Sequence, residues 1–275
     1  MAERKPLIVA NWKMNKTADE ADILAKDLLG QLDVTIVGQL DLVLCPTFLS
    51  ITTVASALKC DGSEAGVEAL PEILLGAQDV YHAPDGAFTG AINARMLAAA
   101  GVSYCIVGHS ERRQNFGETD QTIAPKLVAL IQAGIVPILC VGESYLNRRA
   151  GASDAQAYVL SQVCVALEDA LAQGLQPSEA TLAIAYEPIW SIGTGQSATP
   201  EQAQEIATAI RGELSFVLDK ELAQSTRVLY GGSVNSGNVA EFAMMPDLDG
   251  CLVGGASLDA TEFSQLVTNY TAARS

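Results

Sequence analysis

Short apolar runs alternate with longer amphipathic segments along the whole chain. The apolar runs are rich in Val, Ile and Leu and almost free of charge, a pattern typical of parallel strands buried on both faces. They predict strands at residues 7–13, 40–46, 73–80, 103–109, 135–142, 180–187, 227–231 and 248–254. Strands that alternate with helices predict an α/β fold of repeated strand–helix units.

Helix-start signals occur between the predicted strands. Thr17 and Glu20 form a capping box ahead of apolar positions that recur with helical spacing. Thr199 precedes Pro200, a residue that suits the first position of a helix. Thr119 stands in the same place before a third apolar stripe. These signals predict that helices connect successive strands.

Eight strand–helix units can form either an open doubly wound sheet or a closed barrel. A dinucleotide-binding doubly wound sheet would carry G-x-G-x-x-G after its first strand, where residues 11–15 read NWKMN. We therefore predict a (β/α)₈ barrel. No Gly-, Ser- or Pro-rich linker divides the chain, so residues 1–275 are expected to form a single domain.

Composition and charge narrow the choice of partners. The chain is 49% hydrophobic, enough for a sizeable core, and its net charge is −16. This acidity argues against nucleic acid or an anionic membrane, and it requires any phosphate site to be built locally from a lysine or backbone N–H groups. Since no apolar stretch is long enough for a signal sequence or a membrane span, we expect a cytoplasmic protein.

The six cysteines, at positions 45, 60, 105, 140, 164 and 251, include no C-x-x-C pair. Four of them lie in predicted strands, which favours buried reduced thiols over disulfides or a metal framework. No cluster of His, Cys and Asp has metal-ligand spacing, so no metal is expected. The acidic segment 60–72 is interpreted as a surface insertion; the sequence assigns it no role and gives no reactivity for Cys60 or Cys140.

Glu187 is the first candidate for chemistry, because catalytic groups of such barrels lie at the carboxyl ends of the strands. It follows the sixth apolar run, a position that on its own fits a solvent-exposed carboxylate equally well. The apolar, glycine-closed loop 188–196 after it favours a lid, which would exclude water and raise the basicity of the carboxylate. The sequence therefore predicts that Glu187 acts as a base.

Further candidates stand at other predicted strand ends. A lone histidine is more often structural, but His109 opens a helical turn, and a helix N-terminus favours a neutral ring that donates a hydrogen bond. Lys13 is either a solvated charge or the counter-charge of an anion. The pairs Gly231-Gly232 and Gly254-Gly255 favour the second interpretation, since glycines let a phosphate approach the backbone closely.

Five segments of the sequence together resemble the triosephosphate isomerase family. They read VANWKMN, IVGHSERR, AYEPIWSIGTG, YGGSV and LVGGASL, in the family's order and on the predicted strands. The resemblance implies a TIM barrel that interconverts dihydroxyacetone phosphate and D-glyceraldehyde 3-phosphate through an enediolate, in glycolysis and gluconeogenesis. It also implies that no metal or organic cofactor is needed.

The resemblance further implies a role for each matched residue. Glu187 would carry the proton between the two carbons, and neutral His109 would polarise the carbonyl, a pairing characteristic of the family. Asn11 and Lys13 would hold the substrate, with Glu111 orienting Lys13. The phosphate would bind at Gly193, Ser233, Gly254 and Gly255, and Tyr230 and Ser233 would latch the closed lid.

Members of the family are usually homodimers, and the resemblance implies the same here. The contact would use loop 81–90, with Thr89 near its tip, and Arg112 across the interface. Ala91 stands where the family commonly has an acidic residue, so Arg112 is expected to lack its partner and the dimer to be weakened. Gln196 stands where a lysine is common at the far hinge of the lid, so the resemblance does not define the details of that hinge.

Two alternative functions remain open at this stage. Another phosphate-binding barrel enzyme, such as a Schiff-base aldolase, would need a strand-end lysine in a desolvated pocket, often on the sixth strand. That strand ends in Glu187 here. A non-catalytic module that binds phosphorylated ligands would keep the pocket and lack turnover.

Overall fold

The strands close into a parallel barrel in sequence order, with β8 pairing back onto β1. The computed structural model describes residues 4–59, 72–179, 181–191, 198–218 and 220–274. The strands are β1 (Leu7–Asn11), β2 (Asp41–Cys45), β3 (Ile73–Ala77), β4 (Tyr104–Val107), β5 (Val136–Val141), β6 (Ala183–Tyr186), β7 (Arg227–Tyr230) and β8 (Gly250–Val253). Each lies within a predicted run, and the prediction of an α/β fold with a (β/α)₈ barrel is confirmed.

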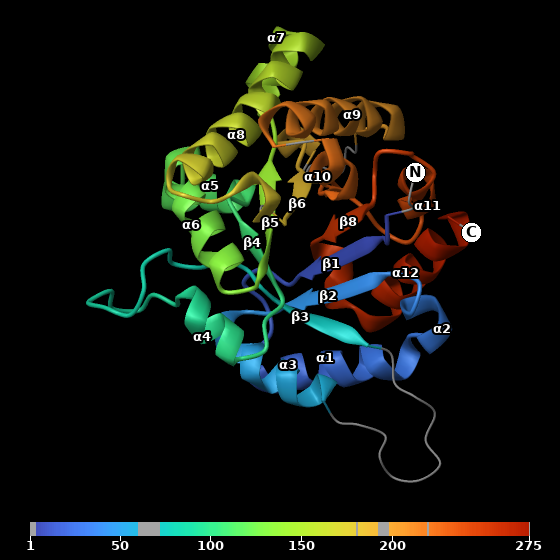
Figure 1. The fold of residues 1–275 in the computed structure, drawn as a ribbon. Coiled ribbons are helices and arrows are strands. Elements are labelled where there is room, and N and C mark those ends of the chain that lie inside the picture. Colours follow the sequence, from blue (N-terminus) through green and yellow to red (C-terminus); the bar gives the residue numbers. More distant parts are fainter. Residues whose placement is uncertain (1–3, 60–71, 180, 192–197, 219, 275) are drawn as a thin grey trace.

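Helices surround the barrel (Figure 1). They are α1 (Ala18–Gln31), α2 (Val34–Val37), α3 (Ile51–Leu58), α4 (Ala94–Ala99), α5 (Ser110–Phe116), α6 (Asp120–Gln132), α7 (Tyr145–Ala150), α8 (Ala152–Ala172), α9 (Pro200–Val217), α10 (Lys220–Ser225), α11 (Val239–Ala243) and α12 (Ala260–Arg274). Short 3₁₀ turns are η1 (Phe48–Ser50), η2 (Pro177–Glu179), η3 (Ile189–Ser191) and η4 (Gly255–Leu258). Thr17, Thr119 and Thr199 are the N-caps of α1, α6 and α9, as predicted.

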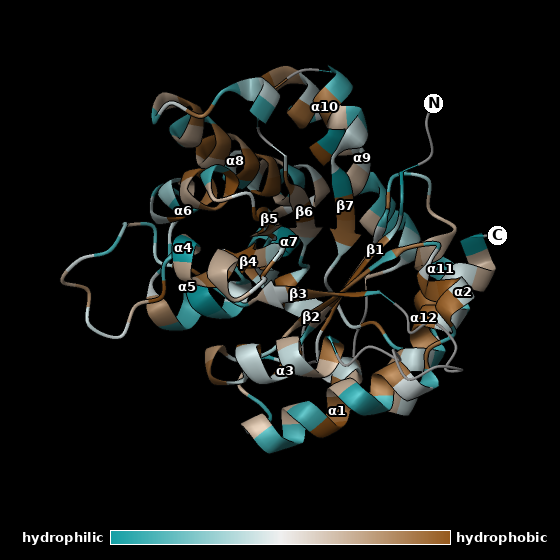
Figure 2. Ribbon diagram, turned by 60° about the horizontal axis from the view of Figure 1, so that its bottom comes forward, coloured by the Kyte–Doolittle hydropathy of each residue, from teal (hydrophilic) through white to brown (hydrophobic). Residues whose placement is uncertain are grey.

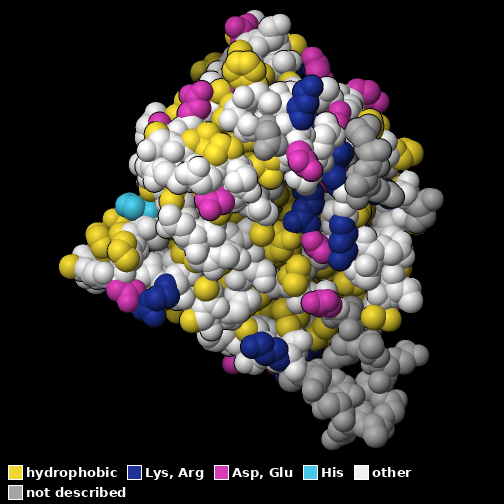
Figure 3. Space-filling model, viewed as in Figure 1, with side chains coloured by type: hydrophobic (Ala, Val, Ile, Leu, Met, Phe, Trp, Pro, Cys, Tyr) yellow, Lys and Arg dark blue, Asp and Glu magenta, His cyan; other side chains and the backbone are white. Residues whose placement is uncertain are grey.

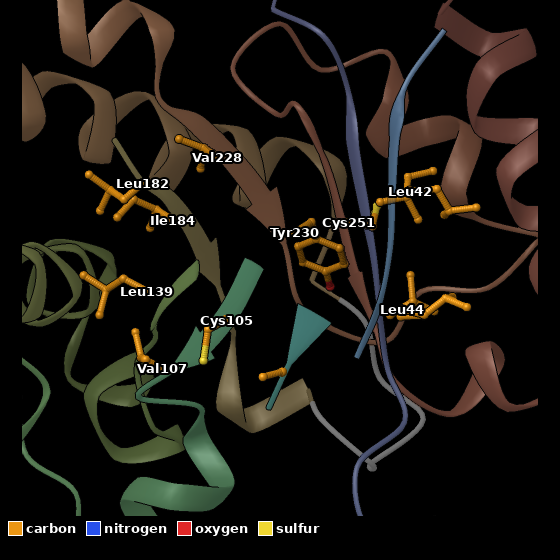
Figure 4. Close-up of a cluster of buried hydrophobic side chains, with 14 of the residues drawn as sticks. Leu42, Leu44, Cys105, Val107, Leu139, Leu182, Ile184, Val228, Tyr230 and Cys251 are labelled. Atoms are coloured by element: carbon orange, nitrogen blue, oxygen red, sulfur yellow. The ribbon is translucent and has the colours of Figure 1, made fainter. Parts of the chain in front are cut away.

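The strand side chains form two apolar layers, because successive residues of a strand point to opposite faces. One layer fills the barrel and consists of strand residues alone, Leu7, Val9, Ile106 and Ile138 among them. The other packs between strands and helices and includes Leu42, Leu44, Val107, Leu139 and Ile184 (Figure 4). Figure 2 shows hydrophobic strands enclosed by helices that carry both hydrophobic and hydrophilic residues. Burial on both faces explains the unbroken apolar runs.

The prediction of buried, reduced cysteines in the strands is confirmed for the described residues. Cys45, Cys105, Cys140 and Cys251 are free and buried, and Cys164 is free and partly buried. Burial raises the pKa of each of the four buried thiols well above the ordinary value, so these thiols stay protonated. Cys60, with the rest of 60–71, lies outside the described residues.

A polar cluster closes the barrel at the amino ends of the strands. Arg227 pairs with Asp41 at 2.5 Å and donates a hydrogen bond to the hydroxyl of Tyr104 at 2.7 Å. These residues belong to β7, β2 and β4, so the cluster spans the interior of the barrel. The amino end of the barrel interior is therefore filled by paired polar side chains.

Asp249, immediately before β8, joins the two ends of the described chain. Its buried carboxylate lies 2.7 Å from Nε of Arg4, 2.9 Å from Nη2 of Arg211 and 3.7 Å from Nη2 of Arg274. One oxygen also accepts the N–H of Val228 at 2.9 Å. The first and last segments of the described chain thus meet at one carboxylate.

Two glycine substitutions should have opposite effects on stability. Gly250 has φ +153° and faces β1 so closely that an added Cβ would lie 1.7 Å from the oxygen of Leu7. Gly250→Ala should lower the free energy of unfolding by about 3 kcal/mol or more. Gly212 lies on α9 with no atom within 4 Å of an added Cβ, and Gly212→Ala should raise that free energy by about 0.5–1 kcal/mol. Urea unfolding at one protein concentration measures both; equal effects would contradict the analysis.

Candidate active site

A cavity of about 700 Å³ opens at the carboxyl ends of the strands. Its lining contains most of the side chains and glycines singled out from the sequence, namely Asn11, Lys13, His109, Glu111, Glu187, Ser233, Gly254 and Gly255. Tyr230 lies behind this lining, and its ring stacks on that of Phe242 with centroids 4.0 Å apart. Gly193 and Gln196 lie outside the described residues.

Glu187 stands directly after β6 and its side chain is almost completely buried, with 2% exposed. Its backbone N–H donates to the oxygen of Val141 at 2.8 Å, which continues the pairing with β5. One carboxylate oxygen, Oε2, accepts the N–H of Ser110 at 2.9 Å. The other, Oε1, is buried and lies 2.9 Å from Nε2 of His109.

The environment of Glu187 keeps this carboxylate ionised. Burial raises the pKa of Glu187, but the adjacent His109 and the hydrogen bond from Ser110 outweigh burial, and the pKa lies below its ordinary value. The group is therefore in the deprotonated state that a base requires. The rise in basicity expected from a closed lid concerns residues 192–197, which lie outside the described residues.

His109 is the N-cap of α5, as the sequence suggested. Its Nδ1 accepts the backbone N–H of Glu111 at 3.2 Å, and a nitrogen that accepts carries no proton. In the neutral ring, this hydrogen bond places the proton on Nε2. Burial lowers the pKa of His109, but the neighbouring Glu187 carboxylate reverses that effect and raises the pKa above its ordinary value. The raising influence acts only while Glu187 lies against the ring.

Lys13 reaches the cavity from a strained backbone. Its φ is +53°, a conformation that costs a non-glycine residue about 1–3 kcal/mol. Its N–H donates to Oδ1 of Asn11 at 3.0 Å, which leaves the amide nitrogen of Asn11 for a ligand. The ammonium pairs with Oε1 of Glu111 at 2.7 Å, the contact expected for an orienting carboxylate.

The glycine side of the cavity lies next to the two ends of the lid loop. Ser233 donates from Oγ to the oxygen of Ser191 at 3.0 Å. The hydroxyl of Tyr230 accepts the N–H of Ala198 at 3.2 Å. Between Tyr230 and Ser233, an added Cβ on Gly232 would lie only 2.2 Å from the Tyr230 hydroxyl. Both proposed latch residues therefore contact the lid at its flanks.

Glu143, two residues after the end of β5, is a buried residue near the site that the sequence analysis missed. Its Oε1 accepts hydrogen bonds from Nε1 of Trp190 at 2.7 Å and from the hydroxyl of Tyr186 at 3.1 Å. Burial raises the pKa of Glu143 despite these bonds. Glu143 thus fixes η3, the first turn of the lid. The signal that could have found it is the one used for Glu187, a carboxylate placed just after a buried strand.

A closed barrel with an ionised carboxylate, a histidine and a lysine around one polar cavity defines an acid–base enzyme site for a small anionic substrate. Comparison with known proteins identifies the family. The sequence model of the family described as triosephosphate isomerase matches residues 6–270.

Individual relatives agree with this match. A protein of Endomicrobium trichonymphae named triosephosphate isomerase is 45% identical over 96% of this chain and 98% of its own length. Proteins of the same name from Symbiobacterium thermophilum and Chloroflexus aurantiacus are 41% and 45% identical, over 98% and 96% of this chain and 99% and 98% of their own lengths. The chain belongs to the triosephosphate isomerase family.

The contact between Glu187 and His109 can be tested by titration. Because the Glu187 carboxylate raises the pKa of His109, Glu187→Gln should lower that pKa and leave burial as the dominant influence. Ring resonances followed by NMR against pH measure the change. The chain has only two histidines, and His82, which lies outside the cavity lining, serves as the internal control. An unchanged or higher pKa of His109 in the variant would rule out the assigned interaction.

Proposed function

We propose that this chain interconverts dihydroxyacetone phosphate and D-glyceraldehyde 3-phosphate and that Glu187, His109, Lys13 and Asn11 carry the reaction. The observation that supports these roles best is the meeting of a buried, ionised Glu187 and the Nε2–H of His109 in one cavity. A base and a hydrogen-bond donor so placed can act on neighbouring carbon and oxygen atoms of one substrate.

The proposed reaction begins with removal of a proton from C1 of dihydroxyacetone phosphate by Glu187. The C–H electron pair forms the C1–C2 double bond, and the electrons of the carbonyl bond move to the oxygen on C2. His109 donates its Nε2 hydrogen bond to that oxygen and transfers protons between the two enediolate oxygens. Glu187 then returns its proton to C2, which gives the aldehyde at C1. Protons and electrons balance without a further reactant.

Lys13 and Asn11 supply the charge and the hydrogen bond that the anionic intermediate needs. Since the chain carries a net charge of −16, the ammonium of Lys13 has to act at short range. We propose that the phosphate binds at the backbone of Ser233, Gly254 and Gly255, together with Gly193. Side chains at these glycines would hinder close approach of the phosphate.

The lid has a chemical purpose in this proposal. An enediolate phosphate can expel its phosphate group if the intermediate stays open to water. A loop over residues 188–196 that closes on the cavity would prevent this loss. The contacts of Ser233 with Ser191 and of Tyr230 with Ala198 support a latch at both flanks of the loop.

The alternative functions have less support. The end of β6 presents Glu187 where a Schiff-base aldolase would need a lysine. A binding module without turnover would have no use for an ionised carboxylate in the lining of its cavity. Proton transfer therefore accounts for more of the site than either alternative.

A homodimer is the second part of the proposal. The segment after β3 projects from the barrel and carries hydrophobic side chains at its tip (Figures 1 and 3). Residues 84–90 of this segment, Thr89 among them, are all exposed. Exposed apolar side chains also follow the neighbouring strands: Leu49 is 89% and Phe116 68% exposed. An apolar surface of this kind is typical of a protein interface.

The expectation that Arg112 lacks a charged partner is wrong. Its guanidinium pairs with Asp79 at 2.8 Å and with Glu118 at 2.5 Å in the same chain. Lys126 pairs with the same two carboxylates, at 2.6 and 2.7 Å. These intrachain pairs remove the reason to expect a weakened dimer, and we propose a homodimer through loop 81–90 and the Arg112 surface despite Ala91.

The extent of the domain and the location of the protein are also proposals. We propose that residues 1–275 act as one domain, since the strands of the barrel are drawn from the whole length of the chain. Within the described ranges, none of the helices combines the length and the apolar character needed to cross a membrane. We further propose a cytoplasmic location, where triose phosphates are turned over.

The role of Glu187 is tested by a coupled assay of triose phosphate interconversion. Glu187→Gln should lower kcat by about 10²–10⁴-fold or more, because the amide cannot accept the carbon-bound proton. Glu241→Gln, the same change at an exposed site on α11, is the matched control and should keep full activity. Isomerase activity that survives Glu187→Gln would refute the assigned base, and an inactive unmodified chain would refute the function.

The dimer is tested by introducing charge into the exposed apolar surface. Leu49→Asp should raise the dimer dissociation constant at least about tenfold, because the carboxylate would be buried without a partner. Phe216, on α9, is equally exposed at 89%, and Phe216→Asp should leave the constant unchanged. Sedimentation velocity over a dilution series measures both. A monomeric unmodified chain, or two variants that behave alike, would argue against this interface.

A further inference from the structure

Gln78 links three strand ends beneath the cavity. It follows β3, one residue after Ala77, and its amide nitrogen donates two hydrogen bonds. One goes to the backbone oxygen of Lys13 and the other to that of Cys45, each at 2.9 Å. Lys13 lies just beyond β1 and Cys45 ends β2, so a single side-chain nitrogen joins the ends of β1, β2 and β3.

The residue that Gln78 contacts is the one whose backbone is strained. Lys13 has a left-handed φ of +53°, and Lys16 is the other non-glycine residue with positive φ in the described chain. A left-handed lysine persists only where its surroundings enforce that conformation. The N–H of Lys13 is held by Asn11 and its C=O by Gln78, so both polar groups of this residue are fixed.

The conformation of Lys13 decides where its ammonium lies. A change of φ to the ordinary negative range would rotate the Cα–Cβ bond and carry Nζ away from Glu111 and the cavity. It would also turn the peptide that Gln78 holds. The hydrogen bond from Gln78 to the Lys13 oxygen and the 2.7 Å ion pair with Glu111 therefore require the same backbone conformation.

We propose that Gln78 is a positioning residue for catalysis, which holds the peptide of Lys13 in its left-handed conformation and so directs the ammonium at the substrate. The inference rests on the proposed function, in which Lys13 contacts the substrate. Gln78 itself is absent from the lining of the cavity. It acts on the reaction only through Lys13.

The chemistry of the site explains why a glutamine is suited to this role. Two carbonyl oxygens need two N–H donors, and the amide nitrogen of glutamine supplies both without a charge. The oxygen of Cys45 also accepts the N–H of Trp12 at 3.2 Å, so both of its lone pairs are used. Methionine has the length of glutamine but no donor, and asparagine has the donors on a shorter side chain.

Gln78→Met is the first test, measured as kcat and KM for triose phosphate interconversion below the melting temperature of every variant. Loss of the hydrogen bond should let Lys13 relax, with kcat/KM falling about 10–100-fold through both a higher KM and a lower kcat. The kcat/KM of Gln78→Asn should lie between those of the unmodified chain and of Gln78→Met. Val54→Ala, in the buried face of α3, lowers stability without touching the cavity and should leave both constants unchanged.

A double-mutant cycle separates positioning from a general loss of structure. If Gln78 acts through Lys13, Gln78→Met should change the residual kcat/KM of Lys13→Met less than about twofold. Equal fold-losses in the two backgrounds would overturn the inference, as would a Gln78→Met chain that only melts earlier. If Gln78→Met does not fold, the cycle is run with Gln78→Asn. An active unmodified chain with unaffected Gln78 variants refutes this inference alone, whereas an inactive unmodified chain refutes the proposed function and this inference with it.

Discussion

The contact between the end of β6 and the first turn of α5 stabilises a buried negative charge in this molecule. Removing a carboxylate from water is costly unless hydrogen bonds and charges replace its hydration. One turn supplies Glu187 with a hydrogen bond from the N–H of Ser110 and places Nε2 of His109 2.9 Å from its carboxylate. The same turn sets the tautomer of His109 through the N–H of Glu111. The charge of the base and the polarity of its partner therefore depend on the placement of one short helix.

That placement is possible because the residues that flank Glu187 on the neighbouring strands are glycines, which have no side chain. An added Cβ on Gly142 would lie 1.7 Å from the backbone oxygen of Glu187, and one on Gly231 would lie 3.0 Å from its Cγ. The neighbours of β6 at its carboxyl end are thus glycines on both sides. They allow β5, β6 and β7 to stay paired up to the point where the carboxylate leaves the strand. Precision at the site is obtained from close backbone packing as much as from side chains.

Much of the fold could be predicted from sequence, because each local signal has one physical cause. Strands buried on both faces give unbroken apolar runs, and Thr119 and Thr199 mark helix starts since their hydroxyls cap free N–H groups. The position of Glu187 followed from the rule that strand ends meet at one face of a barrel. The family resemblance then indicated the reaction and the substrate, which the spacing of residues alone did not identify.

What could not be predicted depends on which side chains meet across the barrel. Arg112 was expected to be unpaired because Ala91 replaces the acidic residue common in the family, whereas its partners Asp79 and Glu118 lie in the same chain. Glu143 has a strand-end position like that of Glu187, but its hydrogen bond to Trp190, far away in sequence, cannot be inferred from that position. Gln78 gave no pattern, since its role rests on a hydrogen bond to Lys13, also far away in sequence. Such contacts are set by strand order and side-chain conformation together, and neither is encoded in a local run of residues.

The meeting of the first and last described segments at Asp249 has a consequence for how the barrel can be connected. Arg4 and Arg274 both contact this one carboxylate, on the face opposite the cavity. The path of the described backbone is therefore nearly a closed ring, in which each strand is paired with two neighbours. A permuted chain, joined across these ends and opened at a surface connection elsewhere, would retain every strand pairing. In this sense the architecture is circular, although the gene that specifies it is linear.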